Sequence, residues 1–390
     1  MGGTDHMTIR HSPHAETSVA ADQAELMVLD GHKLPWHMDR VAAWERWERI
    51  APITIDMALT RACDYSCSFC YAMLQENDRQ VITQEHMAGF LEDSARMGVR
   101  GISLVSDGES LLSPAYVFTI QEGARLGISM ASGTNGRVFT EDKLEAVLPS
   151  LTYIRFNVSG GTRERYCEIM GCKPESFDRV MLNIRTAAAI KRLDHLAVTI
   201  GIQMVLMPTM ADQIMPFAQL GKELGVDYAV IKHCSDDEYG HLGIQYSKYR
   251  DLYPLLQEAE TLSTSNYKVV VKWQKIQREN RRIYSQCFGP PFLIQISGSG
   301  LVAPCGQMFN DRYAKFHIGN ICTDRWWDIW RSDRYWEVMD YLHSKNFDPR
   351  HMCGVLCLQD RVNEALFLHK QGTAPLEAAT EAAPLHVNFV

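Results

Sequence analysis

A regular alternation of short apolar runs with helical segments constrains the fold of this chain more than any other feature. Six runs with the length and composition of β-strands occur between residues 52 and 232, and helical patterns separate them. This alternation predicts a parallel sheet, closed or partly closed into a barrel. In such barrels the chemistry lies at the C-terminal ends of the strands. The predicted strands are 52–60, 101–105, 128–134, 153–158, 197–206 and 228–232.

Three cysteines follow directly after the first predicted strand. Cys63, Cys67 and Cys70 lie in the segment RACDYSCSFCYA, with gaps of three and two residues between them. Three thiolates at this spacing can bind three irons of a cubane [4Fe–4S] cluster and leave the fourth iron without a protein ligand. A structural zinc site usually has four closed ligands, and a disulfide framework needs an oxidising compartment. We therefore favour the cluster over both alternatives.

A second set of cysteines lies nearer the C-terminal end of the chain. Twelve residues separate Cys287 from Gly300, four separate Gly300 from Cys305, and three separate Cys353 from Cys357. Four thiolates are enough to close a cubane cluster completely. A structural zinc ion with four cysteine ligands is the alternative for this set.

The composition argues against several classes of partner. The chain has 390 residues, 46% of them hydrophobic, with a net charge of −8 and a pI of about 6.0. Nucleic-acid-binding proteins normally show a basic patch or stripe, so we expect no nucleic-acid partner. No apolar run approaches a membrane-spanning length and no signal peptide is visible, so we expect no membrane partner. Eleven cysteines without a leader indicate metal sites in a reducing cytosol, which predicts a cytoplasmic location.

Changes in composition divide the chain into five predicted parts. Residues 1–50 form an N-terminal extension, 51–248 the barrel, and 249–282 a charged helical linker. Residues 283–369 form a small C-terminal α+β domain that carries the second cysteine set. Residues 370–390 form a tail, whose segment 370–385 is rich in Ala, Pro and Glu and is expected to be poorly ordered.

The first cysteine set resembles the signature of the radical S-adenosylmethionine (SAM) superfamily, C-x3-C-x2-C with an aromatic residue, here Phe69, before the last cysteine. The resemblance implies a (β/α)6 partial TIM barrel, SAM bound at the open iron, and a flavodoxin or ferredoxin-type reductant. The second set is similar to the twitch domain, the shortened relative of the SPASM domain, which holds one auxiliary [4Fe–4S] cluster. Its last pair departs from the usual C-x2-C by one residue.

Several residues match positions that bind SAM in this superfamily. Gly108 and Glu109 match the two middle residues of a Gly-Gly-Glu-Pro motif after the second strand, whereas Asp107 and Ser110 depart from it. Arg155 is expected to face the lumen, where it holds the SAM carboxylate or an acidic substrate, or forms a structural salt bridge. The remaining candidates for contact with the cofactor are Phe69, Asn135, Asn157 and Ser159.

Cys234 follows the sixth predicted strand and is expected near the barrel mouth. Radical SAM epimerases use a cysteine thiol to give a hydrogen atom to a substrate radical, so Cys234 is the candidate catalytic residue and Cys172 the second. Free cysteines are also frequently small core residues, which is our interpretation of Cys322. No role is assigned to Cys167.

The resemblance implies a 5′-deoxyadenosyl radical that takes a hydrogen atom from a C–H bond of a substrate. Our first hypothesis is a small polar metabolite (a sugar, aminocyclitol or nucleoside) that is dehydrogenated or epimerised in a biosynthetic pathway. The alternative is a maturase that cross-links or epimerises a ribosomal peptide. A non-catalytic iron–sulfur or zinc scaffold is the third reading.

Overall fold

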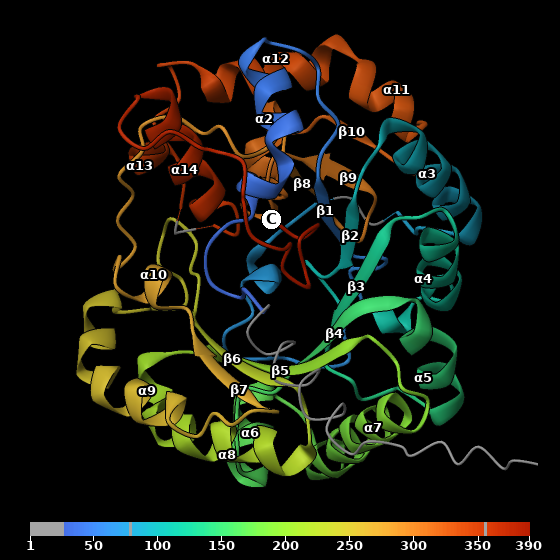
Figure 1. The fold of residues 1–390 in the computed structure, drawn as a ribbon, viewed down its shortest axis with the longest axis vertical. Helices are drawn as coiled ribbons and strands as arrows, with labels where there is room; N and C mark the ends of the chain where they lie inside the picture. The colour runs from blue at the N-terminus through green and yellow to red at the C-terminus, as the bar shows by residue number, and fades with distance from the viewer. Residues whose placement is uncertain (1–26, 78–79, 355–356) are drawn as a thin grey trace, which may run out of the picture.

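The computed structural model describes residues 27–77, 80–354 and 357–390, which fold around one curved sheet (Figure 1). The order of its described strands is β10-β9-β8-β1-β2-β3-β4-β5-β6-β7. From β8 to β7 in this order all neighbours are parallel, whereas β9 and β10 pair antiparallel. The strands are β1 (Thr54–Met57), β2 (Gly101–Leu104), β3 (Ser129–Thr134), β4 (Leu151–Asn157), β5 (Thr199–Leu206), β6 (Tyr228–His233), β7 (Lys268–Val271), β8 (Leu293–Ile296), β9 (Leu301–Ala303) and β10 (Gly319–Asn320).

Helices cover the outside of the curved sheet (Figure 1). Helix α3 illustrates how the sequence sets their ends: the Thr83 side chain accepts a hydrogen bond from the His86 backbone, and Gly98 ends the helix with a φ of 84°. The α-helices are α2 (Met38–Glu45), α3 (Gln84–Met97), α4 (Tyr116–Arg125), α5 (Glu141–Val147), α6 (Arg163–Met170), α7 (Pro174–Leu193), α8 (Ile214–Leu224), α9 (Tyr253–Glu260), α10 (Trp273–Ile276), α11 (Trp326–Arg331), α12 (Asp333–His343), α13 (Pro349–Met352) and α14 (Asp360–Lys370). Short 3-10 helices are η1 (Leu34–His37), η2 (Tyr71–Leu74), η3 (Ser110–Leu112), η4 (Leu148–Ser150), η5 (Pro208–Gln213), η6 (Tyr246–Leu252), η7 (Gly306–Met308) and η8 (Asp311–Phe316).

The six predicted strands are present as β1 to β6, and their parallel arrangement confirms the predicted fold class. The predicted helical linker over 249–282 contains α9 and α10, but it also contains a strand that was not predicted, β7, which adds a further parallel strand to the sheet. Its sequence, KVVV, is too short a run to stand out between two helices. The sheet also continues into the C-terminal domain, because β8 pairs with β1 at Ile55 and Ile294.

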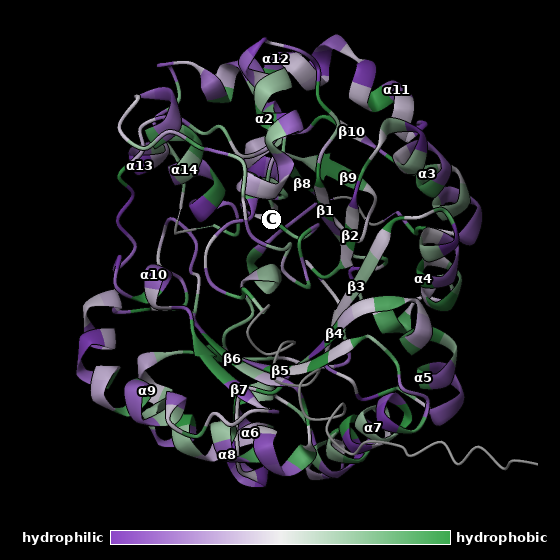
Figure 2. Ribbon diagram, viewed as in Figure 1, coloured by the Kyte–Doolittle hydropathy of each residue, from purple (hydrophilic) through white to green (hydrophobic). Residues whose placement is uncertain are grey.

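Each strand presents one face to the helices and the other to the barrel lumen. On β1, Ile55 and Met57 belong to the large hydrophobic core, so Asp56 between them faces the lumen. The outer helices carry hydrophobic and hydrophilic residues side by side along their length (Figure 2), as expected for helices with one face on a core and one in solvent. The chemistry-bearing side chains are therefore concentrated inside the barrel and in the loops at its ends.

The last residues of the C-terminal tail, beyond the segment 370–385 that was expected to be poorly ordered, pack inside the barrel at the N-terminal ends of the strands. Phe389 is buried and its ring lies 5.0 Å from that of Tyr153. The Asn388 carbonyl accepts a hydrogen bond from Thr54 Oγ1 at 2.8 Å, and its amide donates to Ser129 Oγ at 2.9 Å. The tail thus closes the end of the barrel opposite to the predicted site.

Candidate functional site

The loop after β1, residues 61–77, is called the cluster loop here and is closed by one arginine. The Arg61 guanidinium donates to the Asn77 carbonyl at 3.0 Å and to the Gln75 carbonyl at 2.6 Å. The first of the loop's three cysteines is exposed and the other two are half-buried. These cluster-loop cysteines are Cys63, Cys67 and Cys70.

Three glycines let other segments approach this loop closely. A Cβ on Gly108, whose φ is +88°, would lie 2.1 Å from the Thr60 carbonyl oxygen. A Cβ on Gly298 would lie 2.2 Å from the Thr60 carbonyl carbon, so that peptide is held between two segments. A Cβ on Gly171, at the end of α6, would lie 2.2 Å from the Ser66 oxygen. Each position requires the absence of a side chain.

Asp107, which departs from the superfamily motif, has a specific partner in the structure. Its buried carboxylate accepts hydrogen bonds from Ser297 Oγ at 2.6 Å and from the Gly298 backbone at 2.9 Å. Arg61 Nε lies 3.3 Å from the same carboxylate. Burial raises the pKa of Asp107, and these contacts oppose that rise. The residue therefore joins the end of β2 to the turn after β8.

Glu109 uses its carboxylate to tie β2 to β3. Its Oε1 accepts from Thr134 Oγ1 at 2.8 Å and from the Leu111 backbone at 3.1 Å, and its Oε2 accepts from the Asn135 backbone at 2.6 Å. Burial raises the pKa of Glu109 to about 7, and these three bonds counteract that effect. Its contact with SAM stays a prediction.

Asn135 lies beside the cluster loop, as its predicted role requires. Its side-chain amide donates to Asp64 Oδ1 at 2.6 Å, and Arg137 forms an ion pair with the same Asp64. Asp64 lies directly after Cys63 in the chain. The end of β3 is thereby fixed against the first cysteine of the loop.

The three candidates at the end of β4 behave differently from one another. Asn157 accepts a hydrogen bond from Gln203 Nε2 at 2.8 Å, and the buried Ser159 hydroxyl accepts from the Val205 backbone at 3.1 Å. Both therefore hold β4 to β5. Arg155 faces the lumen, as predicted, and its Nε is buried without a hydrogen-bond partner among the described residues. Their roles toward SAM remain predictions.

Cys234 lies under the cluster loop and is fully buried. Its sulfur is 3.7 Å from the backbone oxygen of Phe69 and 3.5 Å from that of Ser235. Burial raises the pKa of this thiol to about 12. The structure thus brings Phe69 and Cys234 together, but through the Phe69 backbone rather than its ring.

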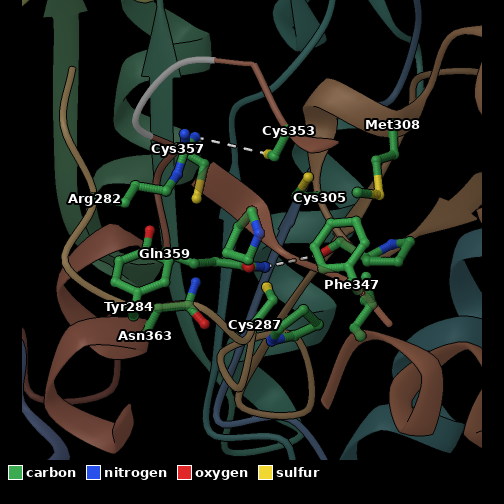
Figure 3. A pocket seen from close by; sticks show the side chains of 14 residues that line it. Arg282, Tyr284, Cys287, Cys305, Met308, Phe347, Cys353, Cys357, Gln359 and Asn363 are labelled. Atoms are coloured by element: carbon green, nitrogen blue, oxygen red, sulfur yellow. Dashed lines mark hydrogen bonds between the residues drawn. The ribbon is translucent and has the colours of Figure 1, made fainter. Parts of the chain in front are cut away.

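The second cysteine set surrounds one pocket (Figure 3), to which its four members contribute their side chains. Arg282 lines the same pocket and its guanidinium donates to Cys353 Sγ at 3.7 Å. Burial raises the pKa of all four thiols, so iron would have to displace their protons on binding. These auxiliary cysteines are Cys287, Cys305, Cys353 and Cys357.

The other lining groups of this pocket fit a thiolate-bound cluster. Asn363 Oδ1 accepts from the Gly289 backbone at 2.7 Å, which leaves its buried Nδ2 as a donor without a partner in the described chain. Such donors, together with Arg282, suit the sulfurs of an iron–sulfur cluster. Across 27–77, 80–354 and 357–390, no three His, Cys, Asp or Glu side chains converge on a single metal ion.

The cluster loop and the auxiliary domain share direct contacts that the sequence analysis did not identify. Gln75 Nε2 donates to the Gly306 carbonyl at 2.5 Å, and the Asp311 backbone donates to the Glu76 carbonyl at 2.7 Å. Gly306 follows Cys305 in the chain, and Tyr71 follows Cys70. A Cβ on Gly306 would lie 3.4 Å from the Tyr71 hydroxyl. The only signal for Tyr71 in the sequence is its place directly after Cys70, a predicted cluster ligand.

Cys167 and Cys322 belong to neither the cluster-loop cysteines nor the auxiliary cysteines. Cys167 Sγ is 3.6 Å from the Lys173 carbonyl oxygen, at the end of α6. Cys322, interpreted as a buried core residue, is half-buried and its sulfur lies 3.7 Å from the Ser299 oxygen. Neither position supplies a further ligand to the pocket in Figure 3.

Two family models match the chain in the segments that carry these sites. Residues 57–220 match the radical SAM superfamily, and residues 287–357 match the SPASM iron–sulfur cluster-binding domain. The second match begins and ends at auxiliary cysteines. The chain therefore carries a radical SAM domain, which implies a [4Fe–4S] cluster and SAM, and a C-terminal SPASM-type domain, which implies an auxiliary iron–sulfur cluster.

Curated relatives match only part of the chain. Proteins described as "Probable GTP 3′,8-cyclase" from Saccharolobus islandicus (strain M.14.25 / Kamchatka #1) and Saccharolobus solfataricus are each 24% identical over 172 residues. The match covers 44% of this chain and 53% of each relative. The chain thus spans about half the length of the curated relatives it matches.

Solved structures show the same fold at low sequence identity. Streptococcus suis SuiB bound to the precursor peptide SuiA aligns with a TM-score of 0.60 and 16% identity, over 89% of this chain and 79% of that one. Native anSMEcpe with bound AdoMet aligns with a TM-score of 0.55 and 14% identity, over 79% of this chain and 90% of that one.

None of the described helices combines the length and apolarity that a bilayer crossing demands.

Proposed function

We propose that this enzyme removes a hydrogen atom from a C–H bond of a small polar metabolite and completes a two-electron oxidation of that substrate. When bound, the clusters and SAM supply a 5′-deoxyadenosyl radical and a second one-electron site. The protein residues position the substrate, exclude water and hold the two cluster sites together. A flavodoxin or ferredoxin-type protein is the proposed source of electrons.

The direct contact between the cluster loop and the auxiliary domain carries this proposal. Gln75 and Glu76 bond to backbone groups of Gly306 and Asp311, and Asp107 bonds to Ser297. These bonds are spread over the loops that hold both cysteine sets. Oxidation of a substrate radical needs a nearby electron acceptor. An auxiliary cluster in a domain that contacts the cluster loop directly would supply it.

The position of Cys234 favours oxidation over epimerisation. A thiol that donates a hydrogen atom must reach the substrate carbon, whereas this thiol is fully buried and faces two backbone oxygens. The hydrogen-donor role of Cys234 is therefore the less supported outcome. If Cys234 donated the hydrogen atom, deuterium from the solvent would appear at the reacting carbon, whereas the proposed oxidation introduces none.

A ribosomal peptide is the second candidate substrate. The likeness over 89% of this chain to SuiB, which was solved with its precursor peptide, favours this candidate. The relatives named for a nucleotide cyclase favour a small molecule instead. Assays with candidate metabolites and candidate peptides decide between the two substrate classes.

The test begins with protein reconstituted without oxygen. We expect about eight irons per chain, as two [4Fe–4S] clusters require, and formation of 5′-deoxyadenosine from SAM after reduction with dithionite. Alanine at all three cluster-loop cysteines should remove about half of the iron and abolish SAM cleavage. Alanine at the auxiliary cysteines should remove the other half and retain SAM cleavage. Cys322→Ala, a matched control, should retain both.

Candidate metabolites and peptides are then assayed in deuterated water. A product two mass units lighter than its substrate supports the proposed oxidation, and deuterium at carbon indicates epimerisation. Absence of SAM cleavage in fully loaded protein would contradict the proposed class of reaction.

A further inference from the structure

The middle of the barrel lumen carries positive charge, and the first of its cations is Arg155. On β4, Tyr153 packs against Phe389 of the tail inside the barrel, so Arg155, two residues later, faces the same side. It pairs in register with Gly201 on β5 and Gly133 on β3. A Cβ on Gly201 would lie 2.2 Å from the Tyr228 ring and one on Gly133 would lie 2.7 Å from Val105, so these two side chains fill the space that the glycines leave.

Two lysines face the same part of the lumen from the next strands. Ile231 on β6 and Val271 on β7 both pack in the outer core, so the residues that follow them, Lys232 and Lys272, face inward. The Lys272 backbone donates to the Ile231 carbonyl at 2.9 Å, which continues the pairing of the two strands to this level. The two ammonium groups therefore lie on neighbouring strands. Arg155, Lys232 and Lys272 are called the lumen cations.

The lumen cations are close enough to repel one another. Burial, and after it Arg155 and Lys275, lowers the pKa of Lys232 to about 7. Burial also lowers the pKa of Lys272, with further lowering from Lys275, Arg155 and Lys232. The acidic groups that act on them are Asp56, on β1, and Asp30. Four cations thus face two carboxylates.

None of the lumen cations forms an ion pair in the part of the chain that the structure describes. The other interior charges are engaged: Lys275 donates to the Cys357 carbonyl at 2.5 Å, and Asp30 accepts from the Gln274 backbone at 3.2 Å. Unpaired charges in a low-dielectric interior are costly unless a ligand compensates them. An anionic oxygen group, by contrast, would find several charge-assisted donors at once.

We propose that the substrate carries an anionic oxygen group, a phosphate or a carboxylate, and that Arg155, Lys232 and Lys272 hold it inside the barrel. The inference rests on the proposed function, because it assigns a substrate class to the same enzyme. The tail closes the barrel below these residues, so the anion enters from the C-terminal ends of the strands, where the cluster loop lies.

The test measures binding of two probes, inorganic pyrophosphate and succinate, by calorimetry on reconstituted enzyme with saturating SAM. Lys232→Met and Lys272→Met are each expected to weaken the preferred probe about tenfold, as loss of one charged hydrogen bond would. The control is Lys222→Met, an exposed lysine on α8 that undergoes the same charge change. Preference for pyrophosphate identifies a phosphate, and preference for succinate a carboxylate.

Three results would overturn the inference. One is that neither probe binds while SAM is cleaved normally, which leaves the proposed function standing. Another is that the probes bind only when SAM is left out, which assigns the cations to the SAM carboxylate. The third is equal binding by Lys232→Met and Lys222→Met.

Folding is checked separately by thermal unfolding without a probe. Because removal of a buried unpaired charge relieves repulsion, Lys232→Met should unfold at the same or a higher temperature than the wild type. A lower temperature, restored by Lys232→Arg, would indicate a structural lysine and would also overturn the inference. If the wild-type enzyme does not cleave SAM, that result counts against the proposed function instead, regardless of whether the probes bind.

Discussion

The closest approach in the site makes Gly108→Ala an informative substitution. The new methyl group would lie 2.1 Å from the Thr60 carbonyl oxygen, and the backbone would have to hold alanine at a φ of +88°. The left-handed conformation costs roughly 1–2 kcal/mol. Steric overlap at a tightly packed position adds roughly 1–3 kcal/mol. We therefore expect a loss of roughly 2–5 kcal/mol in the free energy of unfolding.

A matched control separates these two costs. Gly127 has a φ of +79° and no atom within 4 Å of the position of its missing Cβ. Gly127→Ala should therefore show only the conformational cost of roughly 1–2 kcal/mol. Both variants are compared with the wild type by urea unfolding, followed by tryptophan fluorescence under anaerobic conditions.

The Gly108 variant should also lose function, because the displaced Thr60 peptide begins the cluster loop. We expect less iron at the cluster-loop cysteines and slower SAM cleavage, with the auxiliary iron retained. The Gly127 variant should retain both sets of iron. Equal destabilisation of the two variants, within about 0.5 kcal/mol, would refute the packing of Gly108 against Thr60.

Three further predictions concern the tail, the lumen and the buried thiol. Phe389→Ala should cost about 3 kcal/mol by loss of a buried ring, whereas Leu193→Ala, at a side chain 74% exposed, should cost less than about 0.5 kcal/mol; equal costs in urea unfolding would mean that the tail is loose. Burial raises the pKa of Asp56 to about 7, so the folded state binds a proton more tightly than the unfolded state and stability should fall as the pH rises from about 4 to about 7. Asp56→Asn should flatten that part of the stability–pH curve, and an unchanged curve would contradict the assignment. Cys234→Ala should leave both SAM cleavage and the oxidised product unchanged, and loss of deuterium incorporation in this variant would revive the epimerase alternative.

Local patterns in the sequence were enough to predict the cysteine sets and the six strands. The spacing of Cys63, Cys67 and Cys70 is a property of eight consecutive residues, and their loop follows β1 directly. The strands were found because each is a short apolar run between helices. A parallel sheet follows from that alternation, since strands joined by helices run in the same direction.

The strand β7 and the packing of residues 386–390 were not predicted, for a common reason. The KVVV run is only four residues long, and the tail has the composition of a solvated segment. Their order comes from partners elsewhere in the chain: β6 for the strand, and Thr54, Ser129 and Tyr153 for the tail. The composition of a segment indicates whether it is polar or hydrophobic, but it does not indicate which distant segment it will pack against.

The sequence by itself determined the chemistry of this protein, because ligand spacing and strand–helix alternation are local. The tertiary structure alone decided how the parts work together. Asp107 and Ser297 are 190 residues apart in the chain and Gln75 and Gly306 are 231 apart, yet each pair is hydrogen-bonded. The lumen cations come from separate strands and meet only when the sheet curves. No local pattern encodes such contacts, because they depend on how distant segments pack against one another.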